Sequence, residues 1–143
     1  MASRNVEIMR RAHEAFNHRD FEINLSVMAE TATYREHARG ITMEGREQFR
    51  QFLEAWSTAF TDGTITNAKY IDAGDTVVAQ FTFEGINDGP YAGLPPTGQR
   101  VSCSICEIAR FDPNGMAISV NLYYDQYTIL MQLGHMKPIA AAA

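Results

Sequence analysis

The hydrophobic pattern of the chain changes its period near Thr61. Upstream, apolar residues recur at helical spacing, which predicts amphipathic helices at 4–17, 21–28 and 45–60. Downstream, apolar and polar residues alternate, which predicts strands at 64–71, 76–84, 100–111 and 117–124. An earlier strand is expected at 31–36 and a short last helix at 126–133. We therefore expect an α+β fold, in which helices cover one face of a curved, mostly antiparallel sheet.

Two of the predicted helices carry a strongly apolar face. The face of the first helix consists of Val6, Met9, Ala12, His13 and Phe16. The face of the third helix is the most aromatic in the chain and consists of Phe49, Phe52, Leu53, Trp56 and Phe60. Both faces must be buried against the sheet. Trp56 and Phe60 could also line a ligand cavity and stack on a planar aromatic molecule.

Length and charge exclude several classes of protein. A chain of 143 residues is the usual size of one domain, which we place at 1–136 with a short tail at 137–143. The net charge is −5, with no basic cluster beyond Arg10 and Arg11, so nucleic acid is not an expected partner. No apolar run is long enough to span a membrane, and the N-terminus has no secretory pattern. We expect a cytoplasmic protein that does not bind membranes.

The two cysteines have the spacing of a redox or zinc motif but lie in a predicted strand. Residues three apart on a strand point to opposite faces, so Cys103 and Cys106 do not form a usable pair. No second pair of ligands at zinc spacing is present, and the four histidines are scattered. We expect free thiols and no metal site.

The last strand leads directly into the last helix. Asp125 is placed to cap that helix, and Gly134 to end it in the left-handed conformation. Tyr123 and Tyr124 precede the cap and point to opposite faces, so only one of them can enter a pocket. Asp125 could pair with such polar groups, although capping alone explains it. The Gly- and Pro-rich segment 85–99 is a long loop, and such loops often form lids or binding loops.

Glu107 is the first candidate for a catalytic residue. It shares one face of its strand with the mostly apolar residues Val101, Cys103, Ile105 and Ala109. Burial on such a face would raise the pKa of the carboxyl group, which would make Glu107 a useful base or acid near neutral pH. If this face is instead exposed, Glu107 has a structural role only.

Tyr34 and His37 flank the end of the early strand and are second candidates. An imidazole titrates near neutral pH and could exchange a proton with a substrate, so His37 is a candidate acid or base. A tyrosine in a pocket, Tyr34 or Tyr123, could donate a hydrogen bond to a quinone or enolate oxygen.

Several segments, taken in order, resemble the SnoaL-like polyketide cyclase family. They are Ala15-Phe16-Asn17, Gly45-Arg46-Glu47-Gln48-Phe49, Leu94-Pro95-Pro96-Thr97-Gly98, Asn114-Gly115 and Asp125 followed by Leu130-Met131-Gln132-Leu133-Gly134. The resemblance covers nearly the whole chain. It implies a cone-shaped half-barrel of the kind found in nuclear transport factor 2 and ketosteroid isomerase, with a deep apolar cavity. It also implies a homodimer or homotetramer built on the sheet.

The family cyclases close the last ring of an aromatic polyketide ester by an intramolecular aldol reaction, without a metal or an organic cofactor. The resemblance places their acid/base Asp at Leu122 and the His of the preceding strand at Glu107. The carboxylate is thus missing at one position and present at the other. A one-residue bulge could instead turn Asn121 or Tyr123 toward the cavity.

Three interpretations follow from these observations. The leading one is a tailoring enzyme of antibiotic biosynthesis that acts on an apolar, aromatic polyketide by cofactor-free acid/base chemistry. Its candidate catalytic residues are Glu107, Asp125 and His37, and its candidate substrate-binding residues are Tyr34, Trp56, Phe60, Tyr123, Asn121 and Leu122. The second is a hydroxylase-type relative, because such relatives lack the acid/base Asp. The third is a binding domain without catalysis. Epoxide hydrolysis would need an Asp/Arg/Asp set, which finds no convincing place in the sequence.

Overall fold

The computed structural model describes residues 3–139; residues 140–143 of the expected tail lie outside the described residues. Its helices are α1 (Arg4–Asn17), α2 (Phe21–Ser26), α3 (Gly45–Ala59) and α4 (Gln126–Leu133). Its strands are β1 (Met28–Glu36), β2 (Ile41–Glu44), β3 (Thr64–Ala73), β4 (Thr76–Ile86), β5 (Arg100–Phe111) and β6 (Ala117–Tyr123).

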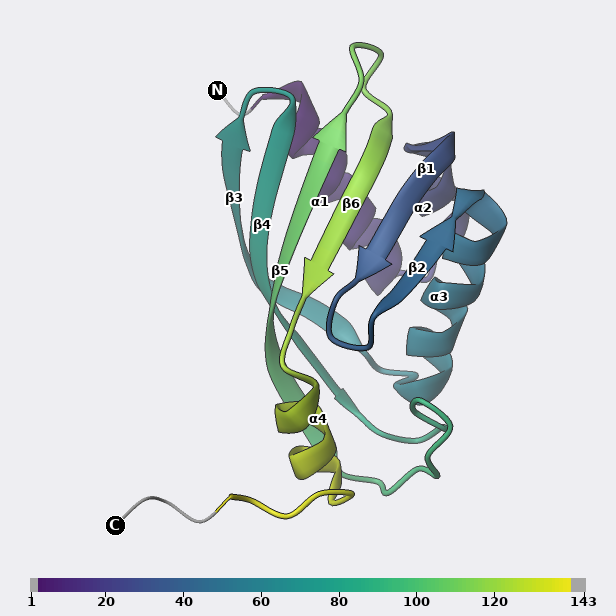
Figure 1. Ribbon diagram of the computed structural model, residues 1–143, viewed down its shortest axis with the longest axis vertical. Helices are drawn as coiled ribbons and strands as arrows, with labels where there is room; N and C mark the ends of the chain where they lie inside the picture. Colours follow the sequence, from purple (N-terminus) through teal and green to yellow (C-terminus); the bar gives the residue numbers. More distant parts are fainter. Residues whose placement is uncertain (1–2, 140–143) are drawn as a thin grey trace.

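The strands form one curved, open sheet in the order β2-β1-β6-β5-β4-β3. Only β1 and β6 run parallel to each other, and all other neighbours are antiparallel. Helices α1, α2 and α3 cover one face of the sheet, while α4 lies at the end of the sheet near the loop between β4 and β5 (Figure 1). This arrangement confirms the predicted α+β fold with helices on a curved, mostly antiparallel sheet.

Local sequence signals set most of the boundaries. The Ser3 hydroxyl accepts a hydrogen bond from the Val6 amide and caps α1, and the Asp125 carboxylate caps α4 as predicted. Gly134 ends α4 with a φ of 89°, the left-handed conformation that glycine adopts without strain. Asp20, which precedes α2, makes no side-chain capping hydrogen bond.

The structure corrects the prediction in two places. No strand was predicted between 36 and 45, but β2 lies there and pairs with β1 from Glu36↔Ile41 to Thr33↔Glu44. Helix α2 ends at Ser26 rather than Met28, because Met28 already pairs with Ala117 as the start of β1. Both differences depend on strand partners distant in sequence, which hydrophobic periodicity does not report.

The core lies between the sheet and the helices. The apolar faces of α1 and α3 pack on the inward residues of β4 and β5, including Val77, Phe81, Phe83, Val101 and Ile105. Cys103 is buried on this inward side, whereas Cys106 is half-buried, and both thiols are free. Burial raises the pKa of Cys103 to about 12. The expectation that the two cysteines do not form a disulfide is confirmed.

The loop between β4 and β5 is held at its base by a buried amide. The Asn87 side chain donates to the carbonyl oxygens of Ala59 and Gly89 and accepts from the Thr97 amide. Gly89 must be glycine, because a Cβ there would lie 2.1 Å from the carbonyl oxygen of Thr58. Beyond this anchor, Tyr91 turns inward and is buried. Over 3–139, no helix has the length and apolar character of a membrane span.

Candidate active site

Four side chains from four elements meet inside the cone. Glu107 comes from the inward face of β5, His13 from the apolar face of α1, Tyr34 from β1 and Tyr70 from β3. Glu107 Oε1 lies 3.0 Å from His13 Nε2, and Glu107 Oε2 lies 2.6 Å from the Tyr34 hydroxyl. His13 Nδ1 lies 2.7 Å from the Tyr70 hydroxyl. The result is one continuous chain of hydrogen bonds, Tyr70–His13–Glu107–Tyr34.

One assignment of protons satisfies this chain with a neutral imidazole. Tyr70 donates to His13 Nδ1, His13 Nε2–H donates to Glu107, and Tyr34 donates to the second oxygen of the same carboxylate. Each Glu107 oxygen then keeps a lone pair for a further proton. His13 holds the carboxylate in place through its Nε2–H, and Tyr70, only half-buried, connects His13 to the surface. The arrangement is that of a base oriented by a second titratable group.

Glu107, His13 and Tyr34 line a cavity of about 70 Å³. The remaining walls are apolar and come from α1, α3 and the sheet: Phe16, Phe49, Phe52, Leu53, Trp56, Ile65, Phe81, Phe83, Ile105 and Leu122. The Phe81 ring packs on the His13 ring at a centroid distance of 4.8 Å. A flat apolar molecule placed here would meet polar groups only at this cluster, which would fix its orientation.

The tyrosines of the cluster stay protonated well into the alkaline range. Burial raises the pKa of Tyr34 well above its usual value, and the adjacent Glu107 carboxylate raises it further. Burial likewise raises the pKa of Tyr70 to about 12, although the cation of Arg10 above its ring opposes the shift. Both hydroxyls therefore act as hydrogen-bond donors at neutral pH.

Tyr34 makes the stability of the fold sensitive to alkaline pH. Above about pH 10 an unfolded tyrosine loses its proton while Tyr34 keeps it, so the free energy of unfolding falls as pH rises. Between pH 10 and 11.5 the free energy of unfolding, measured with urea, should decline with pH less steeply in Tyr34→Phe than in the wild type, by about 1.4 kcal/mol per pH unit. Between pH 6 and 8 the difference between the two proteins should be constant. Equal slopes of the free energy of unfolding against pH in the two proteins above pH 10 would contradict the prediction.

A second polar cluster adjoins the cavity around Glu36, which is 0% exposed. Its carboxylate accepts hydrogen bonds from Nε and Nη2 of Arg39, each at 2.6 Å, and from the Tyr124 hydroxyl. Burial alone would lower the pKa of Arg39, but the hydrogen bonds to Glu36 raise it above the ordinary value. The guanidinium also lies over the rings of Trp56 and Tyr91, and the Tyr91 hydroxyl donates to Gln126.

The structure brings part of the predicted site together. Tyr34, Trp56 and Leu122 line the cavity with Glu107, while Phe60 lies fully buried behind Trp56, stacked on it at 6.1 Å. Leu122 pairs directly with Glu107 of β5 on one side and with Glu36 of β1 on the other. Leu122, the position at which the resemblance predicts the cyclase Asp, is apolar but lies between two strands that each supply a carboxylate.

The other predicted site residues lie away from Glu107. His37, Asn121 and Tyr123 gather on the opposite face of the sheet, where His37 Nε2 lies 2.8 Å from Asn121 Oδ1 and the rings of His37 and Tyr123 stack at 4.3 Å. The bulge considered for β6 is not found at these residues, because its pairing with β5 shifts only near Phe111. Asp125 is exposed and caps α4, where its bonds to Thr128 lower its pKa.

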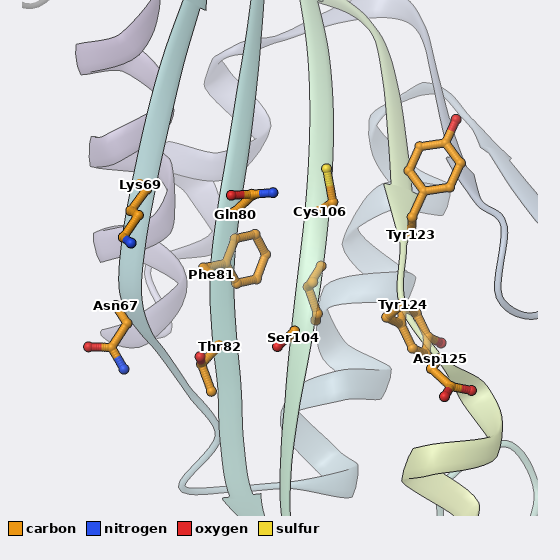
Figure 2. Close-up of a pocket in the computed structure, with 11 residues that line it drawn as sticks. Asn67, Lys69, Gln80, Phe81, Thr82, Ser104, Cys106, Tyr123, Tyr124 and Asp125 are labelled. Carbon is orange, nitrogen blue, oxygen red and sulfur yellow. The ribbon is translucent and has the colours of Figure 1, made fainter.

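That opposite face holds an open hollow of about 630 Å³. Figure 2 shows Lys69, Gln80, Ser104, Cys106 and Tyr123 on it, across the strands from β3 to β6. Tyr123 is 41% exposed there. The hollow is open, is lined by both polar and apolar residues, and lies on the other face of the sheet from the Glu107 cluster. The homodimer or homotetramer expected from the resemblance stays a prediction.

Sequence reasoning missed His13, Tyr70, Glu36, Arg39 and Tyr91. A signal was available for His13, the one ionisable residue on the otherwise apolar face of α1. Glu36 also shares the inward face of β1 with Ala32 and Tyr34, as strand alternation would predict. No local pattern marks Tyr70, Arg39 or Tyr91. Within residues 3–139 no three His, Cys, Asp or Glu side chains are grouped as metal ligands.

Comparisons with known proteins agree with this architecture. IdmH from Streptomyces antibioticus, proposed to be a polyketide cyclase, is 23% identical with a TM-score of 0.79, over 92% of this chain and 99% of its own. AclR from Streptomyces galilaeus, proposed to be a hydroxylase, is 19% identical with a TM-score of 0.82, over 94% of this chain and 83% of its own. A SnoaL-like protein from Jannaschia sp. CCS1 is 23% identical with a TM-score of 0.83, over 96% and 99%.

At these identities the likeness establishes the shared fold. No curated protein sequence matches the chain significantly. The model of the SnoaL-like polyketide cyclase family matches residues 6–133, from the first turn of α1 to the end of α4, and so includes all four members of the Glu107 cluster. The chain therefore belongs to the SnoaL-like polyketide cyclase family.

Proposed function

We propose that the protein is a tailoring enzyme that acts on an apolar, aromatic polyketide by cofactor-free acid/base chemistry, with Glu107 as the base. The observation that carries this proposal is the Glu107 carboxylate at an apolar cavity, hydrogen-bonded to both His13 and Tyr34. A hydrogen-bonded carboxylate and imidazole on an apolar wall are suited to moving a proton to and from carbon.

The proposed reaction is an intramolecular aldol closure. Glu107 removes a proton from the carbon next to a substrate carbonyl, and the electron pair of the C–H bond passes into the enolate. The enolate carbon bonds to a second carbonyl carbon of the same molecule, whose oxygen becomes an alkoxide. The proton held by Glu107 then passes to that alkoxide. Atoms and charge balance without an added reagent, and His13 holds the carboxylate in place throughout.

A hydroxylase is the second candidate, because the resemblance predicts the cyclase Asp at Leu122, whose side chain cannot transfer a proton. Hydroxylation would require O₂ and electrons from the substrate or a partner reductase. A single experiment separates the candidates. In one arm, an anthraquinone-type polyketide methyl ester is incubated with the protein in D₂O without cofactor. In the other arm, the ester is incubated with the protein under air with NADPH and a reductase. The masses of the products are measured by mass spectrometry.

Ring closure, or deuterium at the carbon next to the carbonyl, in the cofactor-free arm supports the proposal. A gain of one oxygen in the aerobic arm alone assigns the protein to hydroxylation. Silence in both arms, with the ester still bound, points to a binding domain and overturns both enzymatic proposals.

A multi-ring substrate requires the cavity to open, because ligand pockets of that kind usually measure about 300–1,000 Å³. Trp56 forms one wall, and Tyr91 of the β4–β5 loop packs against its outer side at a centroid distance of 5.7 Å. Trp56 is the only tryptophan, so the quenching of its fluorescence reports on how far Tyr91 and the β4–β5 loop shield this wall of the cavity from solvent. Tyr91→Ala should raise the acrylamide quenching constant of Trp56 about threefold, because the loop loses its buried anchor. Tyr127→Ala, on α4, is the control, and equal quenching in Tyr91→Ala and wild type would contradict the prediction.

A further inference from the structure

A smaller cavity of about 50 Å³ adjoins the first one. The two cavities share Tyr34, Phe49 and Glu107 as lining residues. Glu107 therefore faces two spaces, one walled by the aromatic residues of α3 and the other extending between α1, α2 and β1. The walls of the smaller space are otherwise apolar, with one exception, the side-chain amide of Asn24 on α2.

Asn24 has a buried acceptor without a partner. Its Nδ2 donates to the carbonyl oxygen of Ala12 at 2.8 Å, which defines the orientation of the amide. The residue is 5% exposed, and among residues 3–139 no protein group donates to its Oδ1. Buried polar atoms without a partner are rare in folded proteins, because each has given up its hydrogen bonds to water. Asn24 Oδ1 therefore requires a hydrogen-bond donor other than the surrounding side chains.

The size of the cavity limits what that donor can be. A cavity needs about 10–15 Å³ of space to hold a water molecule, so this one accommodates a water or the hydroxyl end of a ligand. A methyl group of similar size would leave Asn24 Oδ1 unpaired. Glu107, an acceptor in the same lining, favours the same occupant, because a water has two hydrogens to donate.

We propose that this smaller cavity is a binding site for an O–H donor, either a water molecule or a ligand hydroxyl, held by Asn24 Oδ1 beside Glu107. The donor lies in a space that Glu107 also lines, next to the substrate cavity. It would act as an exchange partner for the proton that Glu107 takes from carbon. This last consequence rests on the proposed function, whereas the site itself does not.

Crystal structures of the wild type and of Asn24→Leu at better than about 1.6 Å, without ligand, test the site. We expect an ordered oxygen within hydrogen-bond distance of Asn24 Oδ1 in the wild type and none in Asn24→Leu, whose side chain has nearly the same size and no acceptor. A wild-type cavity without this oxygen overturns the proposal for water. The wild-type density decides the question even if the variant is unstable.

Binding of phenol and of toluene, measured by calorimetry, tests the hydroxyl as the distinguishing group. The wild type should prefer phenol over toluene by about tenfold, and Asn24→Leu should reduce that preference at least about fivefold. Asn5→Leu is the matched control, because Asn5 also donates through Nδ2 to a carbonyl oxygen but lies at the surface, against Gly74. An unchanged preference in Asn24→Leu overturns the proposal for a ligand hydroxyl.

A crystal structure with phenol separates the two sources. A phenol hydroxyl in place of the ordered oxygen assigns the site to ligands, and an oxygen retained with phenol bound elsewhere, or with no phenol bound, assigns it to water. Neither experiment uses a substrate that turns over. An inactive protein with an occupied Asn24 site would therefore refute the proposed function alone, and an active protein with a dry cavity would refute the site alone.

Discussion

Replacing Glu107 with Gln is expected to slow deuterium exchange or ring closure of the polyketide ester by about 10²–10⁴-fold, the usual contribution of a general base. Gln keeps the shape of the side chain, and its amide oxygen can still accept one of the two hydrogen bonds that His13 and Tyr34 donate to the carboxylate at 3.0 and 2.6 Å. What it loses is the capacity to take a proton from carbon. The rate is measured by mass spectrometry of the exchanged ester, and the dissociation constant by calorimetry.

The dissociation constant should stay within about threefold of the wild-type value, because the apolar walls of the cavity are unchanged and the lost group acts in the transition state. Glu84→Gln is the control, since this glutamate lies on β4 and bonds to Thr66 and Arg100 away from the cavity. Equal loss of rate in both variants, or full rate in Glu107→Gln, would remove Glu107 from the mechanism.

Replacing Glu36 with Ala is expected to lower the free energy of unfolding by about 3–5 kcal/mol, the usual effect of breaking a buried ion pair from one side. The carboxylate is 0% exposed and accepts both hydrogen bonds of the Arg39 fork as well as that of Tyr124. Its removal leaves Arg39, whose side chain is only 21% exposed, without a counter-ion. Urea unfolding followed by circular dichroism measures the change.

Two companion variants show whether the unpaired charge is the cause. Glu36→Leu combined with Arg39→Met removes both charges and should recover most of the loss, because a buried pair is often replaceable by apolar groups. Glu30→Ala removes the partner of a surface pair, with 4.0 Å between Arg46 and Glu30, and should change stability by less than about 1 kcal/mol. A loss in Glu36→Ala no greater than in Glu30→Ala would refute the prediction.

Much of the fold follows from patterns within single elements. The alternation along β5 placed Val101, Cys103, Ile105, Glu107 and Ala109 on one face, and this face does point into the cone. Asp125 and Gly134 bound α4 as predicted, because capping depends only on residues within one turn. Such features involve contacts a few residues apart, which a single sequence displays directly.

The candidate site depends on longer distances in the chain. His13 and Glu107 are 94 residues apart and Tyr34 and Glu107 are 73 apart. Only the packing of α1 on the sheet, and the pairing of β1 with β6 next to β5, brings them together. The position of His37 shows the same dependence, because the turn after β1 directs it to Asn121 on the outer face. Residue type alone did not distinguish the histidine inside the cone from the one outside it.

By itself, then, the sequence determined the order of the helices and strands apart from β2, the residues of β5 that share a face, the caps of α4 and the family. The tertiary structure decided that this face of β5 points inward, which polar side chains share a cavity, and that Leu122 lies between the strands of Glu36 and Glu107. It also decided that Asn24, with its buried unpartnered acceptor, lines a cavity together with Glu107. The reason is physical. Periodicity and capping are short-range and repeat along the chain, whereas a catalytic cluster is set by a few long-range contacts that the packing of the whole core selects.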